Sequence, residues 1–130
     1  MAALVGIVLV SHSPAMAAGL GDLLGELGGG AVAVARAAGT ADGGLGTSDD
    51  LVRRALAEAD GGAGVVVLAD LGSAVLTVRA VLDEGRSPGA VLADAPFVEG
   101  AVAAAVTAST GAERNEVVRA AEAARDFRKF

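Results

Sequence analysis

The sequence predicts a three-layer α/β fold, in which helices cover both faces of an open, mainly parallel sheet. Two apolar runs, residues 4–10 and 65–69, lack polar alternation, which is typical of central strands buried on both faces. A turn-rich stretch and a helix-like pattern follow each run, which is the order found in βαβ units. With 130 residues the chain has the length of one domain, which we expect to span residues 1–130.

The first strand runs directly into the only histidine of the chain, His12. Ser13 can cap a following helix with its hydroxyl, and Pro14 is favoured at the first position of that helix. His12 therefore lies where a strand turns into a helix, at the edge of the sheet where open α/β proteins bind ligands. A helix N-terminus there offers free N–H groups to an anion, so the position suggests phosphoryl chemistry. The alternative is a histidine that is only a surface or core residue.

A second strand is expected at residues 31–35, and a loop that is first turn-rich and then acidic follows over residues 39–50. The loop is either a flexible connection or a segment that faces a phosphoryl group with backbone N–H groups and the Thr47 hydroxyl. Its composition alone favours the connection. The next helix is expected over residues 48–59, with its apolar residues on one side.

The third strand, residues 65–69, ends at Asp70, and a turn of small residues and a helix over residues 74–82 follow. Asp70 and His12 thus hold equivalent positions after two apolar strands. Neighbouring strands lie about 4.8 Å apart, so the Asp70 carboxylate can reach the imidazole if these strands pair. Asp70 would then accept a hydrogen bond from Nδ1–H and leave Nε2 with a free lone pair. A plain helix cap is the alternative role for Asp70.

Two more helices complete the expected pattern. A short strand at residues 90–93 leads into an alanine- and valine-rich helix over residues 97–108, which polar and glycine residues interrupt too early for a membrane span. Residues 110–113 have the spacing of a capping box, which predicts a charged amphipathic helix that ends near residue 127.

The composition excludes several kinds of site and partner. The net charge of −6 disfavours nucleic acid and anionic membrane as partners. The chain has no cysteine and one histidine, so disulfides, thiolate metal sites, cysteine nucleophiles and imidazole metal clusters are excluded, and no metal site is expected. No Lys or Arg precedes Arg36, which argues against a signal peptide. The lack of cysteine fits a cytoplasmic protein.

Four separate stretches carry a family resemblance: LVSHS at residues 9–13, LGT at 45–47, ADLGSA at 69–74 and APFVEG at 95–100. Together they resemble the mannose-type enzyme IIA domains of the phosphotransferase system, and among these the phosphotransfer subunit of dihydroxyacetone kinase, DhaM. That family has a flavodoxin-like α/β fold with a mainly parallel sheet and a phosphorylated histidine. Some members carry further phosphocarrier domains, for which a single domain of this length leaves no room.

The resemblance also implies roles for individual residues. His12 matches the phosphorylated histidine, and Asp70 matches the carboxylate that orients its ring. Loop positions around the phosphoryl group are matched by Ser13, Thr47, Gly72 and Ser73. Sugar-transporter members usually read His-Gly at the active site and carry a longer Asp-Leu-Phe-Gly-Gly-Ser-Pro signature, so the kinase subunit is the preferred match.

By this resemblance the chain is an enzyme, the phosphocarrier subunit of a phosphoenolpyruvate-glycerone phosphotransferase. His12 would accept a phosphoryl group from the protein HPr and pass it to ADP bound on the DhaL subunit, which drives dihydroxyacetone phosphorylation by DhaK. A homodimer is implied as well, and the apolar surface expected for the helix over residues 97–108 favours one.

Nucleotide and sugar substrate are expected on other chains. The only lysine, Lys129, is followed by Phe130, so no P-loop is present and no cofactor is expected. Two alternative functions remain. One is a mannose-family sugar-transporter enzyme IIA, and the other is a non-catalytic, flavodoxin-like regulatory domain with an unmodified His12.

Overall fold

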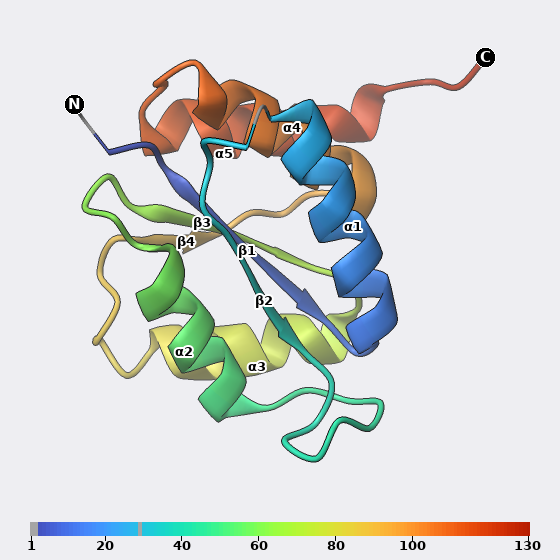
Figure 1. Ribbon diagram of the computed structural model, residues 1–130, viewed down its shortest axis with the longest axis vertical. Helices are drawn as coiled ribbons and strands as arrows, with labels where there is room; N and C mark the ends of the chain where they lie inside the picture. Colours follow the sequence, from blue (N-terminus) through green and yellow to red (C-terminus); the bar gives the residue numbers. More distant parts are fainter. Residues whose placement is uncertain (1–2, 29) are drawn as a thin grey trace.

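Four parallel strands form the sheet of the computed structural model, which describes residues 3–28 and 30–130 (Figure 1). They are β1 (Gly6–Ser11), β2 (Val34–Ala38), β3 (Val65–Ala69) and β4 (Ala90–Leu92), in the spatial order β2-β1-β3-β4. β1 and β3 hold the two central places and are almost entirely buried. Their unbroken apolar sequences are explained by this burial on both faces.

In the described residues, five α-helices cover the two faces of the sheet (Figure 1). One face packs against α1 (Pro14–Leu27), α4 (Phe97–Ser109) and α5 (Arg114–Ala123), which a 3₁₀ turn, η1 (Ala124–Asp126), extends. The other face packs against α2 (Asp49–Ala59) and α3 (Gly72–Leu82). The three-layer α/β class predicted from the sequence is therefore confirmed.

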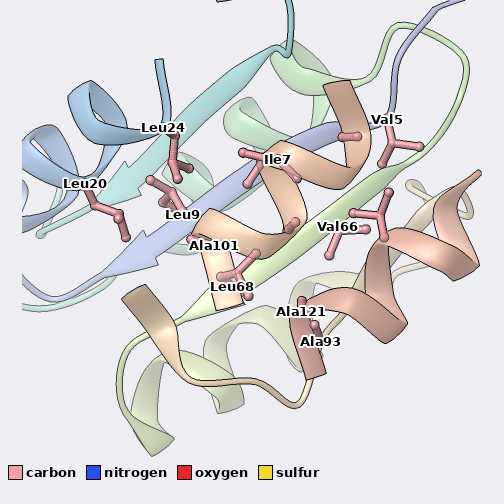
Figure 2. Packing of buried hydrophobic residues seen from close by; sticks show 14 residues of the cluster. Val5, Ile7, Leu9, Leu20, Leu24, Val66, Leu68, Ala93, Ala101 and Ala121 are labelled. Atoms are coloured by element: carbon pink, nitrogen blue, oxygen red, sulfur yellow. The ribbon is translucent and has the colours of Figure 1, made fainter. Parts of the chain in front are cut away.

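Alternate residues of the central strands point to opposite faces of the sheet, so the same strands fill two cores. Figure 2 shows the first core, where Ile7, Leu9, Val66 and Leu68 meet α1, α4 and α5. The intervening residues of β1 and β3 fill the second core against α2 and α3. Both central strands are thereby held in place from two sides, which makes their carboxyl ends a firm support for a site.

Small residues allow α4 to lie close to its neighbours. The buried residues of this helix are Gly100, Ala101, Ala104, Ala105 and Ala108. A Cβ atom added at Gly100 would lie 2.9 Å from the Cβ atom of Ala95 and 3.3 Å from the backbone oxygen of Ala121, so a larger residue there would separate α4 from α5. Across the described residues, no helix combines the length and the hydropathy that a membrane span requires.

The position of β2 differs from the sequence-based expectation. It covers Val34–Ala38 rather than residues 31–35, because its register is set by hydrogen bonds to β1, with Ser11 opposite Ala38. β2 lies at an edge of the sheet, where buried and exposed residues alternate. Because part of an edge strand faces solvent, the exposed Arg36 can lie within β2. A prediction from apolar residues alone ends the strand before Arg36.

The start of α5 also differs. The capping-box spacing placed the N-cap at Thr110, but the helix is preceded by Glu113 and begins at Arg114. Thr110 instead closes α4, and its hydroxyl donates a hydrogen bond to the backbone oxygen of Thr107 at 2.7 Å. The turn between the two helices uses Thr110 to end the first helix, so the residue cannot also begin the second.

The strand order brings the carboxyl ends of β1 and β3 side by side. Val10 pairs with Ala69, and the backbone N–H of Asp70 donates to the oxygen of Val10 at 3.1 Å. The residues that follow the two strands, His12 and Asp70, therefore emerge at the same edge of the sheet. This is the edge at which open α/β folds bind their ligands.

Candidate active site

His12 and Asp70 contact each other directly at the carboxyl edge of the sheet. His12 Nδ1 lies 2.9 Å from Asp70 Oδ1, and the backbone N–H of His12 donates to Asp70 Oδ2, also at 2.9 Å. Both the ring and the main chain of His12 are thus held by one carboxylate. The contact exists because β1 and β3 are neighbours in the sheet.

The Asp70 carboxylate is stabilised in its charged form by several donors. Besides His12, the Ser11 hydroxyl donates to Oδ2 at 3.0 Å, and the backbone N–H of Leu71 donates to Oδ1 at 2.7 Å. Burial alone raises the pKa of the Asp70 carboxyl, but the hydrogen bonds from His12, Ser11 and Leu71 outweigh burial and hold the pKa below its ordinary value. Asp70 is therefore an anion at neutral pH.

This anion fixes the proton on the imidazole. A carboxylate can only accept hydrogen bonds, so His12 Nδ1 carries the proton and Nε2 carries the lone pair. In the structure this lone pair is not free, in contrast to the expectation from the sequence. The Ser73 hydroxyl lies 2.6 Å from Nε2 and is its hydrogen-bond donor. The His12 side chain is 25% exposed, so Nε2 is the ring nitrogen that a ligand can reach.

The two helices whose N-termini flank His12 begin in different ways. Ser13 caps α1, and its hydroxyl accepts a hydrogen bond from the backbone N–H of Met16 at 3.2 Å. Leu71 is the N-cap residue of α3 and makes no side-chain hydrogen bond there, so the first N–H groups of α3, from Gly72 onward, are open to a ligand. Asp70 is thus not the N-cap of α3, which removes the helix-cap alternative for this carboxylate.

The glycine-rich loop between β2 and α2 lies against the main chain of His12. The backbone N–H of Gly46 donates to the backbone oxygen of His12 at 3.0 Å. The Thr47 hydroxyl, for which the resemblance implies a place near a phosphoryl group, lies 2.9 Å from the hydroxyl of Thr77 in α3. At Gly72 an added Cβ atom would meet nothing within 4 Å, so this glycine leaves open space at the start of α3.

Two polar residues of the site were not predicted from the sequence. Ser11 is completely buried, donates to Asp70 and accepts a hydrogen bond from the backbone N–H of Ser13 at 3.1 Å. A serine at the end of an apolar strand was the available indication for this role. Thr77 lies within α3, and nothing in the sequence around it points to its contact with Thr47, thirty residues away.

The site offers a nucleophile and anion donors. Nε2 of His12 supplies a lone pair, and the open start of α3 with the Ser73 hydroxyl supplies hydrogen-bond donors. Within residues 3–28 and 30–130, no group of three or more His, Cys, Asp or Glu residues is arranged to hold a metal ion. The arrangement suits reversible attachment of a phosphoryl group to Nε2.

Comparisons with known proteins agree with this geometry. A family model named EIIA-man, described as the PTS system fructose IIA component, matches residues 6–118. The phosphoryl donor subunit DhaM of PEP-dependent dihydroxyacetone kinase 2 from Listeria innocua is 32% identical over an alignment of 119 residues that covers 89% of this chain and 95% of that protein. The residues matched by the family model include both His12 and Asp70.

Solved structures agree as well. The crystal structure of EF1359, a protein of unknown function, aligns with a TM-score of 0.82 at 32% identity, covering 92% of this chain and 93% of that one. The dihydroxyacetone kinase of C. freundii aligns with a TM-score of 0.56 at 16% identity over 92% of this chain and 24% of that one, which supports the fold alone. The resemblance found in the sequence is thereby confirmed: the chain belongs to the EIIA-man family of the phosphotransferase system and is a relative of the DhaM phosphoryl donor subunits.

Proposed function

We propose that this chain is the phosphoryl carrier of a phosphoenolpyruvate-dependent dihydroxyacetone kinase. His12 accepts a phosphoryl group from phospho-HPr and passes it to ADP bound on DhaL, and the resulting ATP serves the phosphorylation of dihydroxyacetone on DhaK. The observation that carries the proposal is the 2.9 Å contact between His12 Nδ1 and Asp70 Oδ1, which leaves Nε2 as the nucleophile. The DhaM relative, which is a phosphoryl donor subunit of such a kinase, supports the choice of kinase.

The transfer begins when the Ser73 hydroxyl leaves Nε2 of His12. The Nε2 lone pair then attacks the phosphorus atom of the donor's phosphohistidine, and the nitrogen–phosphorus bond to the donor breaks as the new one forms. The proton remains on Nδ1, and the Asp70 carboxylate balances the positive charge of the phosphorylated ring. Phosphoryl transfer passes through a loose transition state, so alignment and hydrogen-bond donors are what the protein must supply.

The donors come from α3. The Ser73 hydroxyl and the N–H groups from Gly72 onward face the three outer oxygens of the phosphoryl group. Ser13 and Thr47 act less directly, because one hydroxyl caps α1 and the other is bonded to Thr77. Transfer to ADP reverses these steps, with the terminal oxygen of ADP as the nucleophile and Nε2 as the leaving group.

The test is a reconstituted assay with phosphoenolpyruvate, enzyme I and HPr. We expect an acid-labile phosphate on the wild-type chain and no dihydroxyacetone phosphate until DhaL with bound ADP and DhaK are added. An exposed-hydroxyl variant on α4, Ser109→Ala, serves as the control for unspecific effects. Formation of dihydroxyacetone phosphate without DhaL and DhaK would show that the carrier proposal is wrong.

The same assay separates the alternatives. A sugar-transporter enzyme IIA would be phosphorylated but would pass its phosphate to an enzyme IIB domain faster than to ADP on DhaL. A regulatory domain with an unmodified His12 would take up no phosphate at all. The acceptor preference of the purified phosphoprotein therefore decides between these functions.

We further propose that the carrier is a cytoplasmic homodimer. Support comes from the outer side of α4, where Val98 and Val106 are exposed and, together with Val102 and Phe127, border a mostly apolar hollow of about 430 Å³. Contiguous apolar surface of this kind favours contact with another protein surface. Light scattering at micromolar concentration measures the mass directly, and a monomer mass would remove the dimer from the proposal.

A further inference from the structure

Two threonine hydroxyls connect the glycine-rich loop to the first turn of α3. Thr47 Oγ1 at the end of the loop lies 2.9 Å from Thr77 Oγ1. Thr77 Oγ1 in turn lies 3.1 Å from the backbone oxygen of Ser73, one helical turn earlier. The chain of contacts thus runs from the loop, through Thr77, to the residue whose hydroxyl contacts His12.

The direction of these hydrogen bonds follows from the groups involved. A backbone oxygen only accepts, so the single hydroxyl proton of Thr77 is donated to Ser73. Thr77 Oγ1 must therefore accept from the hydroxyl of Thr47. Each hydroxyl has one defined donor role, and removal of either side chain oxygen breaks the chain of contacts.

Packing holds the first turn of α3 on one side only, because Ala74 is buried in the core while the residues before it lie on the open side. Leu71 and Ser73 are exposed, and an added Cβ atom at Gly72 would meet nothing within 4 Å. The N-cap residue contributes no side-chain hydrogen bond either. The hydroxyl bond from Thr77 to the Ser73 backbone and the contact with Thr47 therefore connect the open side of this turn to the loop.

From this arrangement we infer that Thr77 is a positioning residue for phosphoryl exchange. It holds the Ser73 hydroxyl at Nε2 of His12 and keeps the loop, whose Gly46 contacts the His12 backbone, against α3. The role in exchange rests on the proposed function, whereas the effect on the unphosphorylated imidazole does not. When a phosphoryl group arrives, the Ser73 hydroxyl needs only to turn from Nε2 to a phosphoryl oxygen, because the Ser73 backbone and the start of α3 stay in place.

Three variants test the inference by the rate of transfer from phospho-HPr. Thr77→Val removes the hydroxyl and keeps the shape of the side chain, and we expect it to lower kcat about tenfold with little change in KM, the smaller end of the loss seen for orienting partners. Thr77→Ser keeps the hydroxyl and should restore the wild-type rate. Thr47→Val breaks the same chain of contacts, so the double variant should be no slower than the slower single variant.

A second measurement needs no phosphoryl transfer. The imidazole nitrogen chemical shifts of His12 in the unphosphorylated protein report the hydrogen bond from Ser73 to Nε2. We expect Thr77→Val to move the Nε2 shift toward its value in Ser73→Ala, and Thr77→Ser to leave it unchanged. The thermal midpoint of each variant shows whether a rate change merely follows lost stability.

Several outcomes would overturn the positioning role. An unchanged rate and Nε2 shift in Thr77→Val would do so, as would additive losses in the double variant or a failure of Thr77→Ser to restore the wild type. If wild-type His12 takes up no phosphate while the Nε2 shift moves as expected, the proposed function fails and the positioning role of Thr77 in the free protein stands.

Discussion

The N-termini of α1 and α3 both flank His12, yet they are used in different ways. At the N-terminus of α1 the Ser13 hydroxyl accepts a hydrogen bond from the backbone N–H of Met16, and Pro14 has no backbone N–H. Few backbone N–H groups therefore remain there for a ligand. The start of α3 has no such side-chain cap and begins with Gly72 and Ser73. Each helix end carries roughly half a positive charge, but only an uncapped end can give its N–H groups to a ligand.

This difference separates stability from chemistry at the site. A serine cap contributes about 1 kcal/mol to the stability of a helix or protein, and Ser13 fills that role for α1. Ser73 caps nothing and contacts the reactive nitrogen instead. Two serines a few residues after neighbouring strands therefore have separable functions, which substitutions can distinguish.

The largest expected effect comes from the nucleophile between the two helix ends. His12→Ala should abolish acid-labile labelling by phosphoenolpyruvate, enzyme I and HPr, because this is the only histidine of the chain. Labelling is measured by phosphate retained at alkaline pH and lost in acid. Phosphate retained by His12→Ala would place the reactive group elsewhere and would end the comparison of the two helix ends.

The next largest effect is expected for the carboxylate that orients the ring. Asp70→Asn puts an amide group where Oδ1 accepts from Nδ1, and an amide N–H can donate to Nδ1 and favour the wrong tautomer. Lost orienting partners cost about 10–100-fold, and in a serine protease about 10⁴-fold. Single-turnover transfer from phospho-HPr measures the loss, and an unchanged rate would show that the Asp70 contact has no part in transfer.

The paired variants Ser73→Ala and Ser13→Ala test the comparison itself. Ser73→Ala should slow transfer about tenfold or more, since a hydrogen bond to a charged group contributes about 1.5–3 kcal/mol, with little loss of stability. Ser13→Ala should instead lower the unfolding free energy by about 1 kcal/mol with a smaller effect on the rate. Urea unfolding and transfer rates give both values, and the reverse pattern would assign the anion to α1.

The smallest effect is expected in the pH dependence of stability. The hydrogen bonds that lower the Asp70 pKa stabilise the fold fully above the ordinary carboxyl pKa of about 3.9. This contribution is lost as the pH falls through the lowered folded-state pKa, so the advantage of the wild type over Asp70→Asn should shrink below about pH 4. The stability lost in Ser13→Ala should not vary over that range, because a serine cap does not titrate. Urea unfolding at a series of pH values compares both, and a constant difference for Asp70→Asn would contradict the assignment.

The sequence was sufficient to predict the central part of the fold and the pair at its edge. The apolar runs of β1 and β3 can only be satisfied by burial on both faces, and that places His12 and Asp70 at equivalent strand ends. The edge strand β2 was misplaced, because half of its residues face outward and its register depends on β1. Apolar pattern is informative where burial is complete and much less so at an edge.

The hydroxyl contacts could not be predicted from the sequence, for a different reason. Thr47 and Thr77 meet only because the loop after β2 folds back onto α3, a path that local residue preferences do not determine. The family resemblance placed Thr47 near the phosphoryl group, whereas its hydroxyl in the structure is bonded to Thr77. A motif can suggest that Thr47 belongs to the site, but the partner of its hydroxyl depends on tertiary contacts.

The single reachable nitrogen of His12 determines the order of events in the reaction we propose. Nδ1 is bound to Asp70, so Nε2 serves both the exchange with the donor and the exchange with the acceptor. Donor and acceptor cannot occupy Nε2 together, which makes the overall reaction a double displacement with a phosphoprotein between its halves. Reciprocal rate plots at several donor concentrations are then parallel lines, and an excess of unphosphorylated donor protein inhibits by competing with the acceptor.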